Sequence, residues 1–318
     1  MTSYFDMLNR HGLKIWGSFM VGTLAAAIPV IVITFFFTFM LAAIVLARLS
    51  GIDPFNSSPE AILETLLNPG MVVVGILFLL FFILISLLTS AFTSAGSIGV
   101  VADSIQKNKT GVGTYFRYGF RRLFPMLGLH LVTLLLAVLP LIPVVIGVLL
   151  FFTETVWGVA WGIILFLLTI VLYIVYGLVV LHAPAVLIAK NKGVFEALSA
   201  SFHAFRTKFG QVALSALILF AITMAGGIVT LVLEGLISGI NPLDPYAEVH
   251  PLRSFLSLIL MFPVNSALQV IVISTLVFRY LRVIHPDPPS DGTPGSLRSG
   301  PEAPSPVESS KLDREASP

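Results

Sequence analysis

Six long stretches of this sequence contain no charged residue, and they limit the folds open to the chain more than any other feature. They are 25 to 38 residues long and cover residues 15–47, 65–102, 123–153, 155–189, 209–233 and 254–278. A helix needs roughly 20 apolar residues to cross the roughly 30 Å hydrocarbon core of a bilayer. Since lipid offers backbone amides no hydrogen-bond partner, a spanning stretch must be helical. The sequence therefore predicts an all-α, polytopic membrane protein with six transmembrane helices.

Composition supports this class and separates a tail from the membrane domain. The chain is 57% hydrophobic and 11% charged, whereas a soluble domain has about 25% charged residues. We expect a six-helix transmembrane domain over 1–284, and its spans are predicted at about 17–47, 71–103, 123–152, 156–188, 209–239 and 254–281. Residues 285–318 are rich in Pro, Ser and Gly with almost no large apolar side chain, so we predict a disordered cytoplasmic tail.

The distribution of basic residues predicts the orientation of the chain. If the spans alternate in direction, sixteen of the 18 Lys and Arg residues lie on one side of the membrane, and only Arg48 and Arg253 lie on the other. Lys and Arg accumulate in cytoplasmic loops. We therefore expect both termini in the cytoplasm, in a multi-pass protein of the plasma or inner cell membrane.

The basic segments between spans also carry a helical pattern. Phe195, Leu198, Phe202, Phe205 and Phe209 recur at steps of three and four residues, as on one face of a helix. Similar aromatic patterns occur at both other such segments along the chain. Aromatic residues beside cations are typical of amphipathic helices that lie among lipid headgroups. The candidate headgroup contacts are Arg117, Arg121, Arg122, Lys190, Lys192, Arg206 and Lys208.

Two of these segments resemble each other. Residues 107–124 read "KNKTGVGTYFRYGFRRLF", and residues 190–209 read "KNKGVFEALSASFHAFRTKF". Both open with KNK and reach Gly-Val shortly afterwards. The pattern indicates three parallel helical-hairpin repeats, each made of an interfacial helix, a span, an outer loop and a second span. The alternative is convergence, because any helix that lies on a membrane surface becomes aromatic and basic.

Polar residues inside spans are candidates for function, because they are costly in lipid. Four of them form a candidate polar path: His130, Glu234, Asn265 and Gln269. The alternative for such residues is a hydrogen bond between helices, worth about 1 kcal/mol. Asp103 is close to a basic segment, where we expect it to form an ion pair. His182 is near the end of a span, and we expect it at the membrane interface.

Signatures of enzymes are absent from the sequence. It contains no cysteine and none of the Walker, HExxH, G-x-S-x-G or dinucleotide-binding patterns. We therefore expect no catalytic residue, no cofactor and no bound metal. A nucleic-acid partner is not expected either, because the cations follow membrane-proximal stripes.

One segment resembles a known family. Residues 183–211, "APAVLIAKNKGVFEALSASFHAFRTKFGQ", are similar to a segment of bacterial and archaeal six-span proteins related to the membrane domain of glycerophosphoryl diester phosphodiesterases. The matching positions are Pro184, Glu196, Ala197, Leu198 and Ser201. The resemblance implies a six-span layout. The phosphodiesterase members carry a separate catalytic barrel of about 250 residues, and this chain has no room for it, so the resemblance implies no hydrolase activity.

These observations leave three hypotheses about function. The first is a non-enzymatic membrane module that contacts lipids or partner proteins through its interfacial helices, with membrane lipids, a protein partner or a second copy as partners. The alternative is a small transporter with a polar path between its spans. The third is a membrane enzyme that acts on lipid. A pocket shared by His130 and Asn265 would favour transport, whereas scattered polar residues would favour the module.

Overall fold

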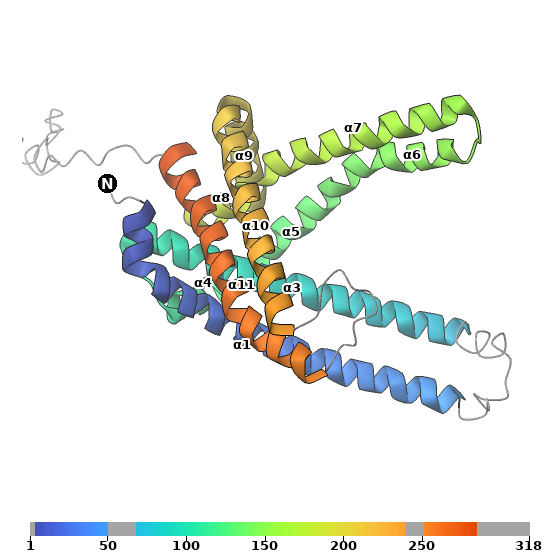
Figure 1. The fold of residues 1–318 in the computed structure, drawn as a ribbon, viewed down its shortest axis with the longest axis horizontal. Coiled ribbons are helices and arrows are strands. Elements are labelled where there is room, and N and C mark those ends of the chain that lie inside the picture. Colours follow the sequence, from blue (N-terminus) through green and yellow to red (C-terminus); the bar gives the residue numbers. More distant parts are fainter. Residues whose placement is uncertain (1–3, 50–67, 239–250, 285–318) are drawn as a thin grey trace, which may run out of the picture. The chain divides into compact units, whose positions relative to one another are not determined.

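The computed structural model describes residues 4–49, 68–238 and 251–284, and throughout these ranges the regular secondary structure is helical, with no strand (Figure 1). Six segments are long and apolar enough to cross a membrane, which confirms the predicted fold class. These segments are Tyr4–Ala47, Pro69–Lys107, Leu123–Phe151, Val156–Ala189, Phe209–Leu236 and Ile259–Ile284. The predicted tail and the loop at 239–250 lie outside the described residues.

The first hairpin consists of α1 (Tyr4–Leu49) and α3 (Pro69–Lys107), which pack against each other. The N-terminal amphipathic segment is not a separate helix, since α1 runs through it without a break and retains Pro29 in its interior. Helix α3 begins at a proline preceded by Asn68, whose side chain accepts a hydrogen bond from the Gly70 amide at 3.0 Å. This is the usual chemistry of a helix start.

Both spans of the second hairpin are interrupted. The third span contains α5 (Leu123–Val138), a 3₁₀ turn at Leu139–Leu141 and α6 (Ile142–Phe151). The fourth contains α7 (Val156–Val180) and α8 (Ala183–Ala189). Prolines lie at both interruptions, as expected of a residue that removes a backbone donor.

Two short amphipathic helices and a third hairpin complete the described chain. Helix α4 (Val112–Arg121) packs on α1 and α3, and α9 (Val194–Thr207) packs on α7 and α8. The third hairpin consists of α10 (Phe209–Ser238) and α11 (Pro251–Arg279), and α11 continues into a π-helical turn to Ile284. Each amphipathic helix therefore rests on the hairpin that precedes it and leads into the next span.

Contacts between distant segments bring the basic segments to one end of the hairpins. His11 Nε2 lies 2.6 Å from Asn108 Oδ1, and the Tyr4 and Thr275 hydroxyls lie 3.0 Å apart. The Lys208 ammonium donates to the carbonyl oxygen of Ile284.

We call the end of the hairpins where these contacts lie the basic end; it comprises residues 4–19, 107–122, 190–208 and 275–284. Far from it, side chains such as Trp157 are 77% exposed, as suits contact with lipid tails.

The best-packed region is at the basic end. The Tyr115 side chain of α4 is buried in a gap between α1 and α3. A Cβ atom added to Gly22 or Gly96 would lie 2.2 or 2.7 Å from its ring, so only glycine leaves room at these positions. Phe19 and Phe92 contact the same ring edge to face, with centroids 6.1 and 5.9 Å away. Tyr115 thereby fixes α4 on the first hairpin.

Candidate functional site

The two KNK turns share an unusual backbone conformation. Asn108, between α3 and α4, has φ 53°, and Asn191, between α8 and α9, has φ 56°. Asparagine adopts this left-handed region more readily than most residues. A glycine then directly precedes each amphipathic helix. The repeated sequence is thus matched by a repeated backbone turn. This match supports an internal repeat over the convergence of two unrelated helices that lie on a membrane surface.

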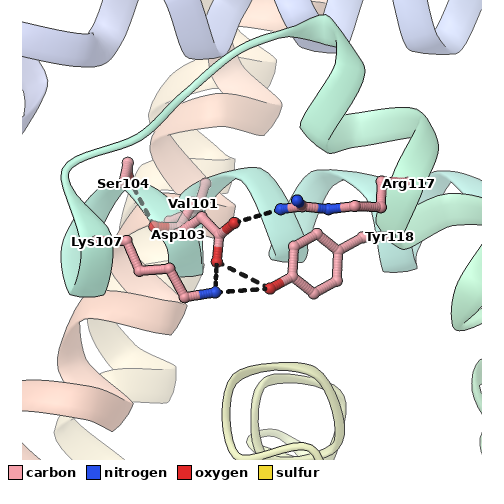
Figure 2. Close-up of polar contacts among 6 residues, drawn as sticks. All are labelled: Val101, Asp103, Ser104, Lys107, Arg117 and Tyr118. Carbon is pink, nitrogen blue, oxygen red and sulfur yellow. Dashed lines mark hydrogen bonds and ion pairs between the residues drawn. The ribbon is translucent and has the colours of Figure 1, made fainter.

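In the first turn a buried carboxylate collects three donors (Figure 2). Asp103 is 2% exposed, and its oxygens lie 2.7 Å from Lys107 Nζ and 2.8 Å from Arg117 Nη2. The Tyr118 hydroxyl donates to the same carboxylate at 2.8 Å. We call these four residues the Asp103 latch. The ion pair predicted for Asp103 is therefore confirmed.

The latch also affects the chemistry of its tyrosine. Burial raises the pKa of the Tyr118 hydroxyl, and its hydrogen bond to the Asp103 carboxylate raises the pKa further. The Arg117 guanidinium lies over the Tyr118 ring, 5.4 Å from its centroid. A Cβ atom at Gly99 would lie 2.2 Å from that ring. The latch therefore ties α4 to the end of α3 through charge, hydrogen bonds and close packing together.

The second turn lacks the corresponding side chains. Arg117 and Tyr118 are the sixth and seventh residues of α4, and those positions of α9 are Ser199 and Ala200. Asp103 is four residues before the first lysine of its KNK turn, and Val186 has that place before Lys190. A carboxylate, a guanidinium and a phenol are thus replaced by an isopropyl group, a hydroxymethyl group and a methyl group.

A groove lies beside the smaller side chains that α9 has in place of Arg117 and Tyr118. Its volume is about 670 Å³, and its lining includes both Ser199 and Ala200. We call it the basic groove; its other lining residues are Lys190, Lys192, Phe195, Glu196, His203 and Tyr280. Its charged lining therefore combines two lysines with a single carboxylate.

A second groove adjoins the first across α9. Its volume is about 470 Å³, and almost all of its lining is apolar. We call it the apolar groove; it lies among α5, the 3₁₀ turn, α7 and α9 and is lined by residues that include Leu136, Leu172, Val175, Leu198, Ser199 and Phe202. Ser199 lines both grooves. A basic surface and an apolar surface thus meet at one side chain.

The face of α9 that packs on the protein differs from its aromatic stripe. Ala197, Ser201 and Ala204 are buried, and Ser201 Oγ donates to the Val179 carbonyl oxygen at 2.5 Å. Phe195, in contrast, is 75% exposed. Phe202 and Phe209 are exposed as well and face where lipid would lie, whereas Leu198 and Phe205 pack partly against the core. Sequence reasoning missed the packed face because small side chains carry little hydrophobic signal.

The predicted headgroup contacts on α4 separate into two kinds. Arg117 belongs to the latch, although its side chain remains 59% exposed. Arg121 is exposed and Arg122 is half-buried. Arg121 and Arg122 therefore stand outside the latch, while the charge of Arg117 is already paired.

The four predicted headgroup contacts around α9 lie in different surroundings. Lys190 and Lys192 line the basic groove. The Arg206 guanidinium lies 5.9 Å from the centre of the Phe202 ring. Lys208 bonds to the Ile284 carbonyl oxygen and so joins α9 to the end of α11. The structure therefore brings two of these four cations into one groove.

The candidate polar path is assembled only in part. Glu234, Asn265 and Gln269 line one groove of about 780 Å³ between α10 and α11, which we call the polar groove. Thr230 Oγ1 donates to Asn265 Oδ1 at 3.3 Å within it. His130 lies on α5 and is not among the lining residues.

His182 is deeply buried at the junction of α7 and α8, and its predicted place at the membrane interface stays a prediction. Its ring lies 5.9 Å from the Tyr280 ring. Neither of its ring nitrogens has a hydrogen-bond partner within the described ranges. A position near the end of an apolar stretch does not show which way the side chain faces, and here it faces α11.

The described residues contain no cluster of metal-ligating side chains. Among residues 4–49, 68–238 and 251–284, no group of three His, Cys, Asp or Glu side chains could hold a metal ion. Comparisons with known proteins add no assignment, since no family model, curated protein or solved structure matches the chain.

Proposed function

We propose that this protein is a non-enzymatic membrane module that binds an anionic lipid at α9. The observation that carries the proposal is the position of Ser199, which lines both the basic and the apolar groove. An anionic lipid has the same two parts side by side, a charged headgroup and acyl chains. The resemblance to membrane domains that are separate from any catalytic barrel is compatible with such a role.

The charges of the basic groove favour an anion. Lys192 and His203 lie on the groove with Lys190, and Glu196 is the acid among its lining residues. A lysine ammonium is a compact charge that binds phosphate without a fixed geometry. If the basic end faces the cytoplasm, as the distribution of Lys and Arg predicts, the groove meets the leaflet that is richest in anionic lipid.

The apolar groove contributes shape more than affinity. An acyl chain that enters it leaves one apolar environment for another, so the transfer brings little hydrophobic gain. Its role is to hold the chain beside α9 while the headgroup reaches the lysines. Discrimination between lipids should therefore depend on headgroup charge.

Native mass spectrometry of delipidated protein with phosphatidylglycerol or phosphatidylcholine of equal chain length tests the proposal. We expect phosphatidylglycerol to bind more tightly. Lys192→Gln should weaken its binding about fivefold, because a lysine near an anionic surface is worth about 1 kcal/mol. Ser199→Trp should weaken binding of both lipids, because the indole would obstruct both grooves.

The matched control is Lys109→Gln, since Lys109 is the third residue of the first KNK turn and is also exposed. This variant should bind phosphatidylglycerol as the wild type does. Equal losses in Lys109→Gln and Lys192→Gln would show general surface attraction in place of a site at α9.

A small transporter is the second candidate, and the polar groove favours it because three of the four predicted path residues line that groove. The absence of His130 from its lining weighs against a single path. Flux of small polar solutes across vesicles containing the protein, compared with the Asn265→Ala variant, distinguishes this function from lipid binding.

A further inference from the structure

The polar groove presents amide side chains on the surface of a membrane span. Asn265 and Gln269 are both exposed and lie one helical turn apart on α11. Gln269 is ten residues before Arg279 at the basic end, which is about 15 Å along a helix. This places its amide near the middle of a hydrocarbon core of about 30 Å.

Such a position is unfavourable in a lone copy of the chain. Lipid tails offer no hydrogen bond to an amide, and buried polar groups are normally paired. Thr230 donates to the Asn265 oxygen. Within the part of the chain that the structure describes, the Gln269 side chain makes no hydrogen bond.

We infer that a second copy of this chain covers the polar groove, so that the protein is a homodimer through its α10–α11 hairpins. An amide both donates and accepts, so the same groups on two copies satisfy each other across a twofold axis. The groove also has space for close approach. Gly227 lies on it, and a Cβ atom built there would meet nothing within 4 Å.

The form of the groove favours a second copy over a solute. All of its lining residues belong to α10 and α11, two consecutive helices of one hairpin. A solute path through a single copy would need helices on its remaining sides. Two hairpins placed face to face supply them, and they bury the amides of both copies at once.

Cysteine cross-linking in the membrane tests this inference. Because the chain contains no cysteine, any disulfide must form at the introduced residue. Thr223 and Val272 line the groove. The variants Thr223→Cys and Val272→Cys leave both amides in place. On oxidation, we expect a disulfide-linked dimer from at least one of them. Leu217→Cys is the control, because Leu217 is an exposed α10 residue outside that lining.

A second measurement uses no cysteine. Single-molecule photobleaching of labelled protein diluted into liposomes gives the dimer fraction. The wild type should show two-step bleaching, and Asn265→Leu with Gln269→Leu should raise the dissociation constant roughly tenfold, as expected for lost hydrogen bonds between spans. One-step bleaching of the wild type, or cross-linking of Leu217→Cys equal to that of both groove variants, overturns the inference. Neither outcome bears on lipid binding at α9.

Discussion

The two KNK turns have the same backbone and opposite surroundings. In the first, Asp103 draws Arg117 and Tyr118 of α4 into a closed cluster. In the second, valine, serine and alanine stand at the equivalent positions, and the serine and the alanine line a groove of about 670 Å³. The comparison shows that one turn can fasten a helix or border a groove, depending on the side chains around it. It also suggests which substitutions should convert one into the other.

The largest expected difference concerns the fourth residue of each amphipathic helix, Tyr115 in α4 and Ala197 in α9. Tyr115→Ala would leave a cavity between α1 and α3. Loss of a buried aromatic ring costs about 3 to 5 kcal/mol. Ala197→Gly removes one methyl group and should cost about 1 kcal/mol, mainly through helix propensity. Unfolding in mixed detergent micelles measures both, and equal costs would show that Tyr115 does not fix α4.

The Asp103 latch should contribute the next largest effect. Asp103→Asn keeps the shape of the side chain and removes its charge, so Lys107 and Arg117 lose their ion pairs. We expect the free energy of unfolding to fall by about 2 kcal/mol, less than for a fully buried pair because both cations remain half exposed.

Glu196→Gln is the control for that variant, because Glu196 is an exposed acid near the second turn. Its effect should stay within about 0.5 kcal/mol. If Asp103→Asn is equally mild, the latch is a surface feature without a role in stability.

Sequence reasoning reached those features that depend on composition or on near neighbours. The six spans follow from the needs of a backbone in lipid. An ion pair of Asp103 with the adjacent basic segment was predicted from their closeness in the sequence, and Lys107, four residues on, lies on the same helix face. The KNK repeat was visible as well, although the left-handed asparagines within it were not.

Features that depend on distant packing could not be predicted. Tyr115 fills a gap made by Gly22 and Gly96, and nothing local in the sequence links these positions. That Ser199 lines both grooves depends on the exact start of α9, because three residues lie between Asn108 and Val112 and only two lie between Asn191 and Val194. The burial of His182 was not predicted for the same reason, since burial depends on what packs against the helix.

Transferring the latch to the second turn should remove lipid binding. Val186→Asp, Ser199→Arg and Ala200→Tyr together reproduce the three missing groups. The arginine and tyrosine side chains should fill the basic groove and weaken phosphatidylglycerol binding at least about tenfold, or 1.4 kcal/mol. Native mass spectrometry measures this change. Ala200→Tyr alone separates occlusion from charge pairing, and unchanged binding by the triple variant would contradict a lipid site at α9.

The smallest predicted effect is a dependence of stability on pH that arises at Tyr115. Burial raises the pKa of the Tyr115 hydroxyl to about 12, from an ordinary value of about 10. The folded state thus favours the neutral phenol, and this contribution is complete below pH 10 and is lost as the pH rises to 12. At pH 10.5 the wild type should have lost about 0.8 kcal/mol through this group.

Other tyrosines and lysines titrate in the same range, so the informative quantity is the difference between the wild type and Tyr115→Phe. The phenylalanine ring fills the same gap, and it gives up the 3.5 Å contact of the hydroxyl with the Thr93 carbonyl oxygen and its hydrogen bond with the Thr23 side chain. Between pH 9 and 10.5 the free energy of unfolding of the wild type should fall further than that of the variant, by about 0.8 kcal/mol. Parallel pH profiles would mean that the phenol reaches water, and α4 would then be held to the first hairpin mainly by the Asp103 latch.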